Sequence, residues 1–500
     1  MNPSVLRVAV QGCGHGMLDR IYSQLQTRYA KLPDVLLICG DFQAIRHQRD
    51  LDDMAVPAKY KHMGDFQKYY TGEAEAPILT IIIGGNHEAS GHFAELFYGG
   101  WVAPNIYYLG AAGSVILRKH GCAESLRITG VSGIFKDHDY DKPRAERLPL
   151  SEKTQRSIYH TRRFDTLRML LLGESVYSAN TNAVFDVVMS HDWPVGVTSF
   201  GNEKKLLQIK PHFRADVQKG QLGSPGHTDL LRVLRPRHWF AAHMHVKFEA
   251  DVSHATLASD TRPLHYDERQ YIPRSMVQQQ PKRSFNPDEI SLDMGDDDDD
   301  DSNRESAPAV QTEKRVRTGS LSTSTDSHPV PVQTKQRTCG TLAKRPGTAT
   351  TRFLALDKCT ERRLDNLDMA EIEMLAGNSK ETGEQVQGDG EGEGDGKGVY
   401  LEYDPHWLAV IRATNSSMPR THGDANVCLP ITSSQQYAEL VAKVAHQLAF
   451  VQTELGSKSS MKIPVISSTA TAGTLTNVRA PHPQTARFCT WLGIDNHALY

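Results

Sequence analysis

Five short motifs stand out in the first half of the chain, because their side chains are of the types that bind metal ions. They are Cys13-Gly14-His15, Gly40-Asp41, Gly85-Asn86-His87-Glu88, Ser190-His191-Asp192 and His243-Met244-His245. Histidine, cysteine, aspartate and asparagine are all ligands of first-row transition metals. A carboxylate such as that of Asp41 has two oxygens and can bridge two ions about 3.5–4 Å apart. The motifs therefore predict a site for one or two metal ions.

Each motif follows an apolar run of strand length. The runs are 6–11, 35–39, 78–83, 185–190 and 238–242, and further strand candidates are 106–109, 114–117 and 126–131. Leu18, Ile21 and Leu25 have the spacing of an amphipathic helix between the first two strands. Sites in α/β sheets form beyond the carboxyl ends of the strands. We therefore expect the five motifs to converge on one cleft of an α/β fold.

Taken singly, each motif has an ordinary structural explanation. Gly-Asp after a strand is usually a turn, and Gly-Asn-His can be a tight turn with left-handed residues. A lone histidine on an apolar flank is more often a hydrogen-bonded structural residue than a ligand. Separate turns do not explain five such motifs in order, four of them at strand ends, which favours one shared site.

The ordered set of motifs resembles the calcineurin-like metallophosphoesterase family, whose pattern is D-x-H, G-D-x, G-N-H-[DE], a lone His and G-H-x-H. The sequence departs from that pattern twice, with Cys13 in place of the first Asp and Ala242 in place of a Gly. A thiolate is a softer ligand than a carboxylate and shifts the metal preference towards Zn or Fe. We expect Fe, Zn or Mn as the divalent cofactor.

Longer stretches are similar to the lariat debranching enzyme family. They are GCGHGMLDRIY, CGDFQAIR, SGIFKDHDY, RSIYH, SHDWP, HMHVKFEA, FLALDKC, YDPHWLAVI and PHPQTARFCTWLGI. The resemblance covers about 5–270 and much of 352–494. It implies a metal-dependent phosphodiesterase that hydrolyses the 2′-5′ bond at the branch point of excised lariat RNA, giving linear RNA for turnover.

The resemblance also implies roles for single residues. One metal would be held by Cys13, His15, Asp41 and His245, and the second by Asp41, Asn86, His191 and His243. His87 resembles the family's proton donor and would protonate the departing 2′ oxygen. The alternative for His87 is a residue that orients the neighbouring ligand Asn86.

The stretch 132–163 is the predicted RNA-binding segment, because cations neutralise phosphates and aromatic rings stack on unpaired bases. Its candidate substrate-binding residues are Lys136, Tyr140, Arg156, Tyr159 and Arg162. A charged segment that contains proline is more often an ordinary surface loop. Its place between the site motifs, and its likeness to the family's lariat recognition loop, favour the RNA-binding interpretation.

Composition divides the chain into three parts. We predict a catalytic domain over 1–270, a disordered acidic and Ser/Thr-rich linker over 271–351, and a smaller C-terminal helical domain over 352–500 with a floppy insertion at 377–398. The linker contains six consecutive aspartates and, over 286–352, no Phe, Trp or Tyr, so it cannot bury enough apolar surface to order itself. The family fold implied for the first part is an α/β/β/α sandwich, in which helices flank two β-sheets.

Other properties bound the function. The net charge of −3 gives no global field for nucleic acid, although a local basic groove remains open. We find no apolar run of about 18 residues and expect no membrane partner. Seven scattered cysteines indicate reduced thiols in a cytosolic or nuclear compartment.

The location and partners follow from the resemblance. Because lariats arise in the nucleus, and because 314–317 reads KRVR, we expect nuclear residence. The C-terminal region is a candidate surface for splicing-associated proteins.

Two rival interpretations remain at this point. One is another metal-dependent phosphoesterase, such as a protein phosphatase or a phosphodiesterase. The Asp-Arg-Gly that phosphatases show after their Gly-Asp motif is absent here, where Phe42 and Gln43 follow Asp41. The other rival is a non-catalytic scaffold on the same fold. A scaffold should have lost ligands, whereas only position 13 is altered, and to another good ligand.

Overall fold

The structure is a computed structural model that describes the greater part of the chain. The described residues are 5–180, 182–259, 347–360, 364–376, 398–418, 434–456, 461–466 and 482–497. All of them fall within the compact unit formed by Met1–Tyr271 and Cys339–Tyr500. The predicted linker lies outside the described residues as far as 346, and the predicted floppy insertion as far as 397.

The first sheet has six strands in the order β12-β1-β2-β3-β5-β4. Their bounds are Leu367–Glu373 (β12), Val5–Gln11 (β1), Val35–Ile38 (β2), Leu79–Ile82 (β3), Ile106–Tyr108 (β5) and Gly100–Ala103 (β4). The four central strands are parallel, and the two edge strands run antiparallel to their neighbours. The parallel centre brings the carboxyl ends of β1, β2 and β3 to the same edge of the sheet.

The second sheet has the order β10-β11-β9-β8-β7-β6-β14, with β13 paired to β7. The bounds are Phe248–Ser253 (β10), Thr350–Ala355 (β11), His238–Ala241 (β9), Val187–Ser190 (β8), Glu124–Val131 (β7), Ala112–Lys119 (β6), Val399–Tyr403 (β14) and Leu375–Ala376 (β13). Strands β11, β9, β8 and β7 are mutually parallel. The ends of β8 and β9, which carry two of the motifs, therefore also lie at one edge.

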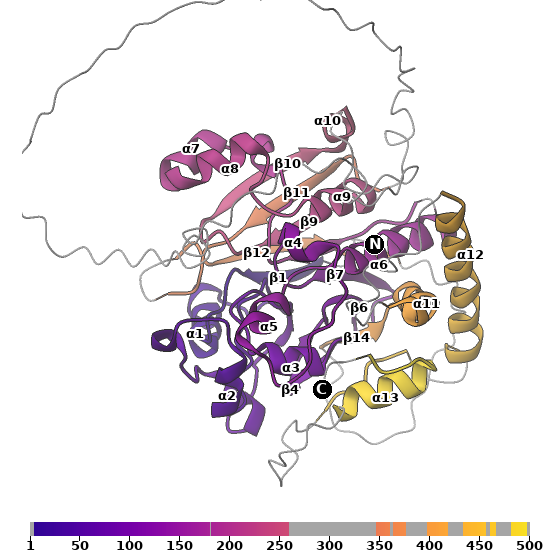
Figure 1. Cartoon of the computed structure of the whole chain (residues 1–500), viewed down its shortest axis with the longest axis horizontal. Helices are drawn as coiled ribbons and strands as arrows, with labels where there is room; N and C mark the ends of the chain where they lie inside the picture. The colour runs from indigo at the N-terminus through magenta and orange to yellow at the C-terminus, as the bar shows by residue number, and fades with distance from the viewer. Residues whose placement is uncertain are drawn as a thin grey trace, which may run out of the picture. The chain divides into compact units, whose positions relative to one another are not determined.

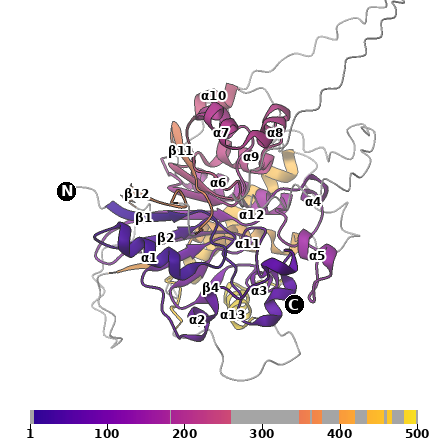
Figure 2. The same ribbon diagram turned by 90° about the vertical axis from the view of Figure 1, so that its left-hand side faces the viewer.

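Helices complete the layers. The bounds are Leu18–Arg28 (α1), Phe66–Thr71 (α2), Ser90–Glu95 (α3), Asp137–Tyr140 (α4), Glu152–Ser157 (α5), Arg163–Ala179 (α6), Glu203–Ile209 (α7), Arg214–Lys219 (α8), Pro225–Leu234 (α9), His254–Ser259 (α10), Pro405–Thr414 (α11), Ser434–Phe450 (α12) and Pro483–Leu492 (α13). Figures 1 and 2 show α1 beside β1 and β2, and α6, α11 and α12 on the side of the second sheet.

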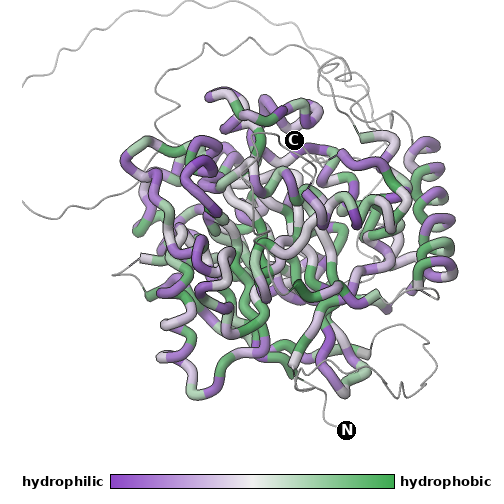
Figure 3. The backbone as a smooth tube through the Cα atoms, turned by 90° about the horizontal axis from the view of Figure 1, so that it is seen from below, coloured by the Kyte–Doolittle hydropathy of each residue, from purple (hydrophilic) through white to green (hydrophobic). Residues whose placement is uncertain are grey.

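Alternating side chains on the strands join the layers into a sandwich. In β2, Val35 and Leu37 belong to the core between the two sheets, together with Ile128 and Phe240 from the second sheet. Leu36 and Ile38 point to the opposite face and pack with α1. This alternation follows from the two-residue period of a strand, and both faces are apolar because both are covered. Figure 3 shows the hydrophobic segments gathered in the interior and the hydrophilic residues along the outer helices.

The α/β/β/α sandwich expected from the family resemblance is confirmed. The strands predicted from the apolar runs are found as β1, β2, β3, β5, β6, β7, β8 and β9. The spacing of Leu18, Ile21 and Leu25 gives α1, in which all three side chains are buried. Helix α12 likewise carries apolar residues at helical spacing, of which Val444 and Leu448 are buried. Strands β4, β10 and β11 to β14 were not predicted, and the last four show that the C-terminal region, predicted to be helical, also contributes strands.

The C-terminal residues enter both sheets rather than packing as a body of their own. Strand β11 lies between β9 and β10, β12 pairs with β1, and β14 pairs with β6. Composition predicts two domains over 1–270 and 352–500, whereas the structure places their described residues in one compact unit. The reason is hydrogen bonding between strands distant in sequence, which local apolar patterns do not reveal.

Among the helices that the structure describes, none has the length and apolar character needed to cross a membrane.

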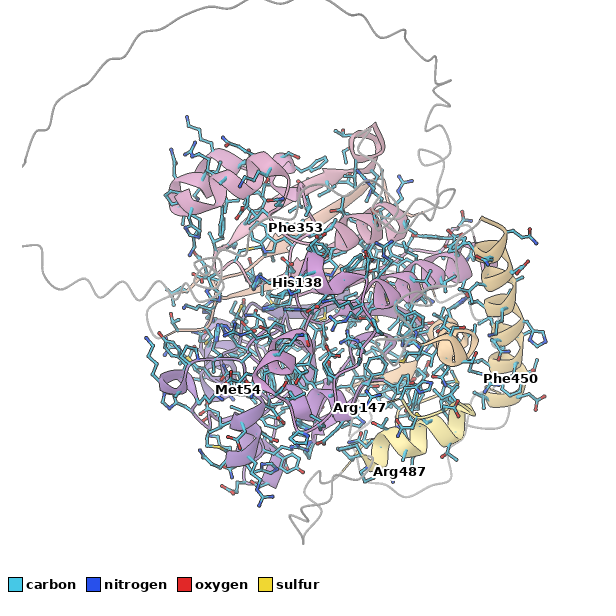
Figure 4. The ribbon with its side chains drawn as sticks, in the orientation of Figure 1. Met54, His138, Arg147, Phe353, Phe450 and Arg487 are labelled. Atoms are coloured by element: carbon cyan, nitrogen blue, oxygen red, sulfur yellow. The ribbon has the colours of Figure 1, made fainter. Side chains whose placement is uncertain are left out.

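The integration of β11 predicts that Phe353→Ala destabilises the whole unit. Phe353, labelled in Figure 4, is fully buried between Trp193 and Phe248, with ring centroids 5.5 and 6.4 Å away. Truncating a buried phenylalanine costs about 3–5 kcal/mol in free energy of unfolding. Urea unfolding of the full chain, followed by tryptophan fluorescence, measures the loss. Val465→Ala, at a side chain 70% exposed, is the matched control and should change stability by less than about 0.5 kcal/mol.

Candidate metal centre

Four of the predicted metal ligands lie together at the ends of β1, β2 and β9. One ligand atom from each of Cys13, His15, Asp41 and His245 lies within 4.8 Å of the others. The His15 Nε2 atom is 3.4 Å from His245 Nε2 and 3.7 Å from Asp41 Oδ2. These four residues are the set that the resemblance assigned to the first metal. Two imidazoles, a carboxylate and a thiol fit a transition metal such as Zn or Fe.

The predicted ligands of the second metal adjoin this group. The His191 Nε2 atom is 3.3 Å from Asp41 Oδ1 and 3.1 Å from Asn86 Oδ1. The His243 ring centroid lies 5.0 Å from that of His191, and the His243 backbone N–H points at Cys13 Sγ, 3.3 Å away. Asp41 thus faces the first group with one oxygen and His191 with the other, as a bridging carboxylate would.

The backbone at the site is held in an uncommon conformation. His15, Asp41, His243 and His245 have φ angles of 47°, 47°, 63° and 47°. Such left-handed angles are unfavourable for residues with a Cβ and persist only where the surroundings impose them. Four of the predicted ligands share this strain. The sheet ends therefore fix the directions of these side chains, which pre-organises the site.

Two glycines allow the ligand loops to approach one another closely. A Cβ atom on Gly40 would lie 2.3 Å from His191 Nδ1, and a Cβ on Gly85 would lie 2.2 Å from Asp41 Oδ1. Either contact is far below van der Waals distance. The glycines of the second and third motifs are therefore needed for the packing of Asp41 against His191.

The surroundings favour the metal-binding forms of the side chains. Burial lowers the pKa of His15 to about 4 and also lowers the pKa values of His191 and His245, so these imidazoles are neutral at pH 7. Burial opposes the charge of Asp41, but His191, His87 and His15 hold its pKa well below the usual value. His191 Nδ1 lies 2.7 Å from the Cys39 carbonyl oxygen, to which it donates when protonated there. That tautomer leaves the Nε2 lone pair facing Asp41.

Cys13 differs from the other predicted ligands. Burial and the charge of Asp41 raise the pKa of its thiol well above the ordinary value. A divalent cation reverses this preference, because a coordinating thiol loses its proton. The buried thiol therefore becomes a thiolate ligand only together with a metal.

Glu88 has a role that the sequence analysis missed. Its Oε1 accepts hydrogen bonds from the backbone N–H groups of Phe42 (2.8 Å) and Gly85 (2.9 Å), and its Oε2 accepts one from Gln43 (2.7 Å). Burial and the charge of Asp41 raise its pKa to about 8, although the three donors stabilise the charged form. Glu88 thus ties the loop that carries Asp41 to the loop that carries Asn86. The signal available in the sequence was an acidic residue directly after the Gly-Asn-His motif.

His87 lies at the open side of the site. Its Nδ1 is 3.7 Å from Asp41 Oδ2, its backbone N–H donates to Asp41 Oδ1 at 2.9 Å, and its side chain is 20% exposed. Its ring centroid is 5.5 Å from that of His15. The imidazole is therefore beside both ligand groups and accessible from outside, which is the placement that a proton donor to a bound phosphate ester needs.

The structure corrects two of the predicted substrate contacts. Arg162 is only 2% exposed, and it pairs with Glu146 Oε1 at 2.6 Å. Tyr140 is also buried, and its hydroxyl donates to Thr166 Oγ1 at 3.0 Å. Both side chains face inward because they hold the segment to the domain, so neither is placed to touch RNA. His138 and Arg147 mark this segment in Figure 4.

The other three candidates lie nearer the surface. Arg156 is exposed on α5, whereas Lys136 and Tyr159 are partly exposed. Lys136 precedes α4, and its carbonyl oxygen accepts from the Tyr140 backbone N–H at 3.0 Å. These three residues remain predictions for RNA contacts.

A second group of metal-binding residue types lies in the same segment. Ligand atoms of His138, Asp139 and His160 lie within 4.8 Å of one another. Asp139 is already paired on both oxygens, with His160 Nδ1 at 2.7 Å and Lys142 Nζ at 2.8 Å. The ammonium of Lys142 neutralises the carboxylate of Asp139. These contacts therefore explain the cluster as a structural feature that holds the segment together.

Comparison with known proteins agrees with this geometry. Residues 6–247 match the family described as calcineurin-like phosphoesterase, so the fold and the site define a protein of that class. Residues 348–497 match the C-terminal domain of the lariat debranching enzyme. The lariat debranching enzyme of Schizosaccharomyces pombe is 38% identical over 422 residues, which cover 83% of this chain and 80% of that relative. The chain therefore belongs to the lariat debranching enzyme family.

Animal relatives match over a shorter stretch. The lariat debranching enzyme of Homo sapiens is 50% identical over 252 residues, which cover 50% of this chain and 44% of the relative. That of Gallus gallus is 49% identical over 261 residues, which cover 52% and 46%. The matched stretch thus spans less than half of the length of these two relatives.

The hydrogen bonds of Glu88 predict that Glu88→Gln loosens the site. A glutamine offers one acceptor oxygen and an NH₂ group that faces a backbone donor, so one buried donor is left without a partner at a cost of about 1–3 kcal/mol. We expect lower stability by that amount and a lower content of bound metal, because the loops of Asp41 and Asn86 separate. Denaturant unfolding and elemental analysis measure the two effects. Glu152→Gln, at an exposed position on α5, is the control. Unchanged metal content in Glu88→Gln would refute the positioning role.

Proposed function

We propose that the protein hydrolyses the 2′-5′ phosphodiester bond at the branch point of lariat RNA and releases linear RNA. The observation that carries the proposal is the convergence of Cys13, His15, Asp41 and His245 next to the His191–Asn86 pair. Family membership supports the substrate, and the metal-binding set supports the reaction class. The products are a 2′-hydroxyl on the branch nucleotide and a 5′-phosphate on the released strand.

The protein residues would hold two divalent ions, with Asp41 shared between them. Divalent ions such as Fe, Zn or Mn, held by these residues, would supply Lewis-acid activation of the phosphate ester and of water. Cys13, His15 and His245 would complete one ligand set, and Asn86, His191 and His243 the other. Because the backbone already holds these ligands in place, little reorganisation accompanies binding.

His87 would act as the general acid. When the bond between phosphorus and the 2′ oxygen breaks, that oxygen needs a proton, and the His87 imidazole is the accessible group beside both ligand sets.

Recognition of the RNA would rest on the partly exposed residues of the segment before α6. Arg156 and Lys136 would neutralise phosphates, and Tyr159 would stack on a base. Arg162 and Tyr140 would support the segment from inside through their bonds to Glu146 and Thr166.

The proposal extends to location and partners. Lariat RNA is formed in the nucleus, so we propose nuclear residence, with the basic stretch 314–317 as its signal. We further propose that splicing-associated proteins bind the C-terminal region. Imaging of a tagged chain and purification of its partners from nuclei test these two points, and a cytoplasmic protein without such partners would refute them.

The test of function is cleavage of a short synthetic RNA that carries one 2′-5′ branch. We expect metal-dependent loss of the branch, abolished by chelator, and no cleavage of a linear 3′-5′ RNA of matched sequence. His87→Ala should lower kcat by about 100- to 10,000-fold, because the leaving 2′ oxygen loses its proton donor. The same variant should affect bis(p-nitrophenyl) phosphate much less, because p-nitrophenolate leaves without a proton. His212→Ala, at an exposed histidine, is the control.

Three other outcomes would reject the lariat substrate, the enzymatic function or the general-acid role of His87. An inert branch beside rapid hydrolysis of a phosphoprotein or a generic phosphodiester would reject the lariat substrate and keep the phosphoesterase class. Purified protein that binds no metal would support a scaffold. An equal loss on both substrates in His87→Ala would reject the general-acid role and favour the orienting role.

The thiol ligand predicts a change of metal preference in Cys13→Asp. A carboxylate is harder than a thiolate, so the ratio of bound Zn or Fe to bound Mn should fall. Loading the purified apoprotein with an equimolar mixture, followed by elemental analysis, measures the ratio, and Cys122→Ser is the control outside the site. An unchanged ratio would show that Cys13 does not contact the metal.

A further inference from the structure

Helices α7 and α8 form a hairpin whose base is tied to two of the metal-binding loops. The chain enters the hairpin region at Trp193, two residues after the predicted ligand His191, and leaves it at Ser224. The Ser224 backbone N–H donates to the Trp193 carbonyl oxygen at 2.7 Å, which closes the base. The Trp193 indole N–H donates to the carbonyl oxygen of Ala242, directly before His243, at 2.7 Å. The hairpin therefore starts from the fourth motif and is bonded to the fifth.

The hairpin packs on β10, the strand that begins three residues after His245. Gly201, just before α7, forms an isolated β-bridge with β10. A Cβ atom on Gly201 would lie 2.4 Å from the Glu249 carbonyl oxygen, so the two backbones are in close contact. Leu206 of α7 and Phe213 beside α8 are buried in the apolar core that covers the second sheet. The hairpin is therefore a fixed part of the domain, and Figure 1 shows it beside β10.

The exposed side chains of the hairpin carry positive charge only. Its exposed charged residues are Lys204, Lys205, Arg214 and Lys219. The two acids of the hairpin, Glu203 and Asp216, are partly buried instead, and Glu203 Oε2 accepts a hydrogen bond from Thr198 Oγ1 at 2.6 Å. Within the part of the chain that the structure describes, the four cations form no ion pair. This local concentration of positive charge contrasts with the net charge of −3 for the whole chain.

A branched RNA needs binding surface beyond the metal centre. Three strands meet at its branch point, because the branch nucleotide carries phosphodiesters on its 5′, 3′ and 2′ oxygens. Only the 2′ linkage is cleaved in the proposed reaction, so the other strands leave the centre across neighbouring surfaces. Exposed cations beside the metal-binding loops match such a strand, since Lys and Arg neutralise phosphates and release their counterions. An acidic protein segment would match the charge, but it would not explain why the hairpin is bonded to those loops.

We propose that the α7–α8 hairpin binds the phosphate backbone of an RNA strand that leaves the branch point. The inference rests on the proposed function, because it takes lariat RNA as the ligand. It adds a second RNA-binding surface to the segment 132–163. Contacts to phosphates position a strand without reading its sequence, so binding at this surface should depend on the length of the RNA arms and on salt.

The test neutralises the cations of the two helices separately. The variants are Lys204→Gln/Lys205→Gln on α7, Arg214→Gln/Lys219→Gln on α8, and Lys204→Arg/Lys205→Arg, which keeps the charge. The matched control is Lys31→Gln/Lys443→Gln, which also removes two exposed positive charges. Lys31 precedes β2, at the end of the first sheet opposite to the ligands, and Lys443 lies on α12.

Two branched RNAs serve as substrates of the metal-loaded protein. One has a single nucleotide on each arm, and the other has arms of roughly ten nucleotides, within the size range of single-strand binding sites. Their KM and kcat values are measured for every variant. Binding of a linear single-stranded RNA is followed by fluorescence anisotropy at several salt concentrations.

We expect each Gln double variant to raise KM for the long-armed RNA, and to weaken binding of the linear RNA, by about 5- to 30-fold, the range for two exposed ion pairs. The slope of log affinity against log salt should become smaller by about 1.4, since each phosphate contact on a single strand contributes about 0.7. The values of kcat, metal content, melting temperature and KM for the short-armed RNA should stay at wild-type levels. The Arg double variant and the control should match wild type.

Wild-type KM and salt slope in both Gln double variants would overturn the inference. An equal rise of KM for both RNAs, or the same loss in the control, would also overturn it, because the effect would then not depend on a strand at the hairpin. The proposed function fails separately, if the wild-type protein binds RNA but leaves the branch uncleaved. In that case the loss of RNA binding in the two Gln double variants would still support the surface.

Discussion

The buried carboxylate of Asp41 is the group on which the arrangement of the site depends. With 1% of its surface exposed, its charge is stabilised by contacts rather than by water. His15, His87 and His191 each place a ring nitrogen within 3.7 Å of its oxygens, and the His87 backbone N–H donates to it at 2.9 Å. A second buried acid, Glu88, lies close enough that the charge of Asp41 raises its pKa. Two buried acids this close repel each other when both are charged, and divalent cations held at the site would offset that repulsion.

The sandwich provides the stiffness that this arrangement requires. The predicted ligands follow strands of both sheets. The core between the sheets therefore fixes the distance between the ligands from the first sheet and those from the second. Close-packed cores do not deform continuously, so the strained backbone at His15, Asp41, His243 and His245 is maintained. The glycines at positions 40 and 85 remove the steric obstacle that any larger residue would place between the loops.

The C-terminal strands belong to the same two sheets as the strands of the first region, so the predicted domain boundary does not separate two structural units. Strand β11 is an interior strand of the second sheet, paired on one side with β9 and on the other with β10. Without it, β9 would lose the neighbour that supports the residues before His243 and His245. The region that matches the debranching-enzyme C-terminal domain is thus part of the scaffold of the metal centre. The phosphoesterase region alone exposes an unpaired sheet edge at that point.

The sequence alone determined the local elements and the composition of the site. Apolar runs of strand length placed β1, β2, β3 and β5 to β9, and the three-to-four-residue spacing of apolar side chains placed helix α1. The residue types and their positions after strands predicted a metal site, and the family resemblance assigned its ligands; the structure brings Cys13, His15, Asp41 and His245 together as the resemblance implied. The family could also be recognised from the sequence, because its motifs are short stretches that occur in the same order along this chain.

Only the tertiary structure decided how distant segments meet. The pairing of β11 with β9 joins residues more than one hundred positions apart, and no local pattern specifies that partner. The burial of Arg162 and Tyr140 depends on Glu146 and Thr166, which their own neighbours in the sequence do not reveal. For the same reason, the sequence did not reveal that Glu88 accepts hydrogen bonds from three backbone N–H groups. Spacing along the chain fixes which face a side chain occupies, whereas its burial and its charge partners are set by what folds against that face.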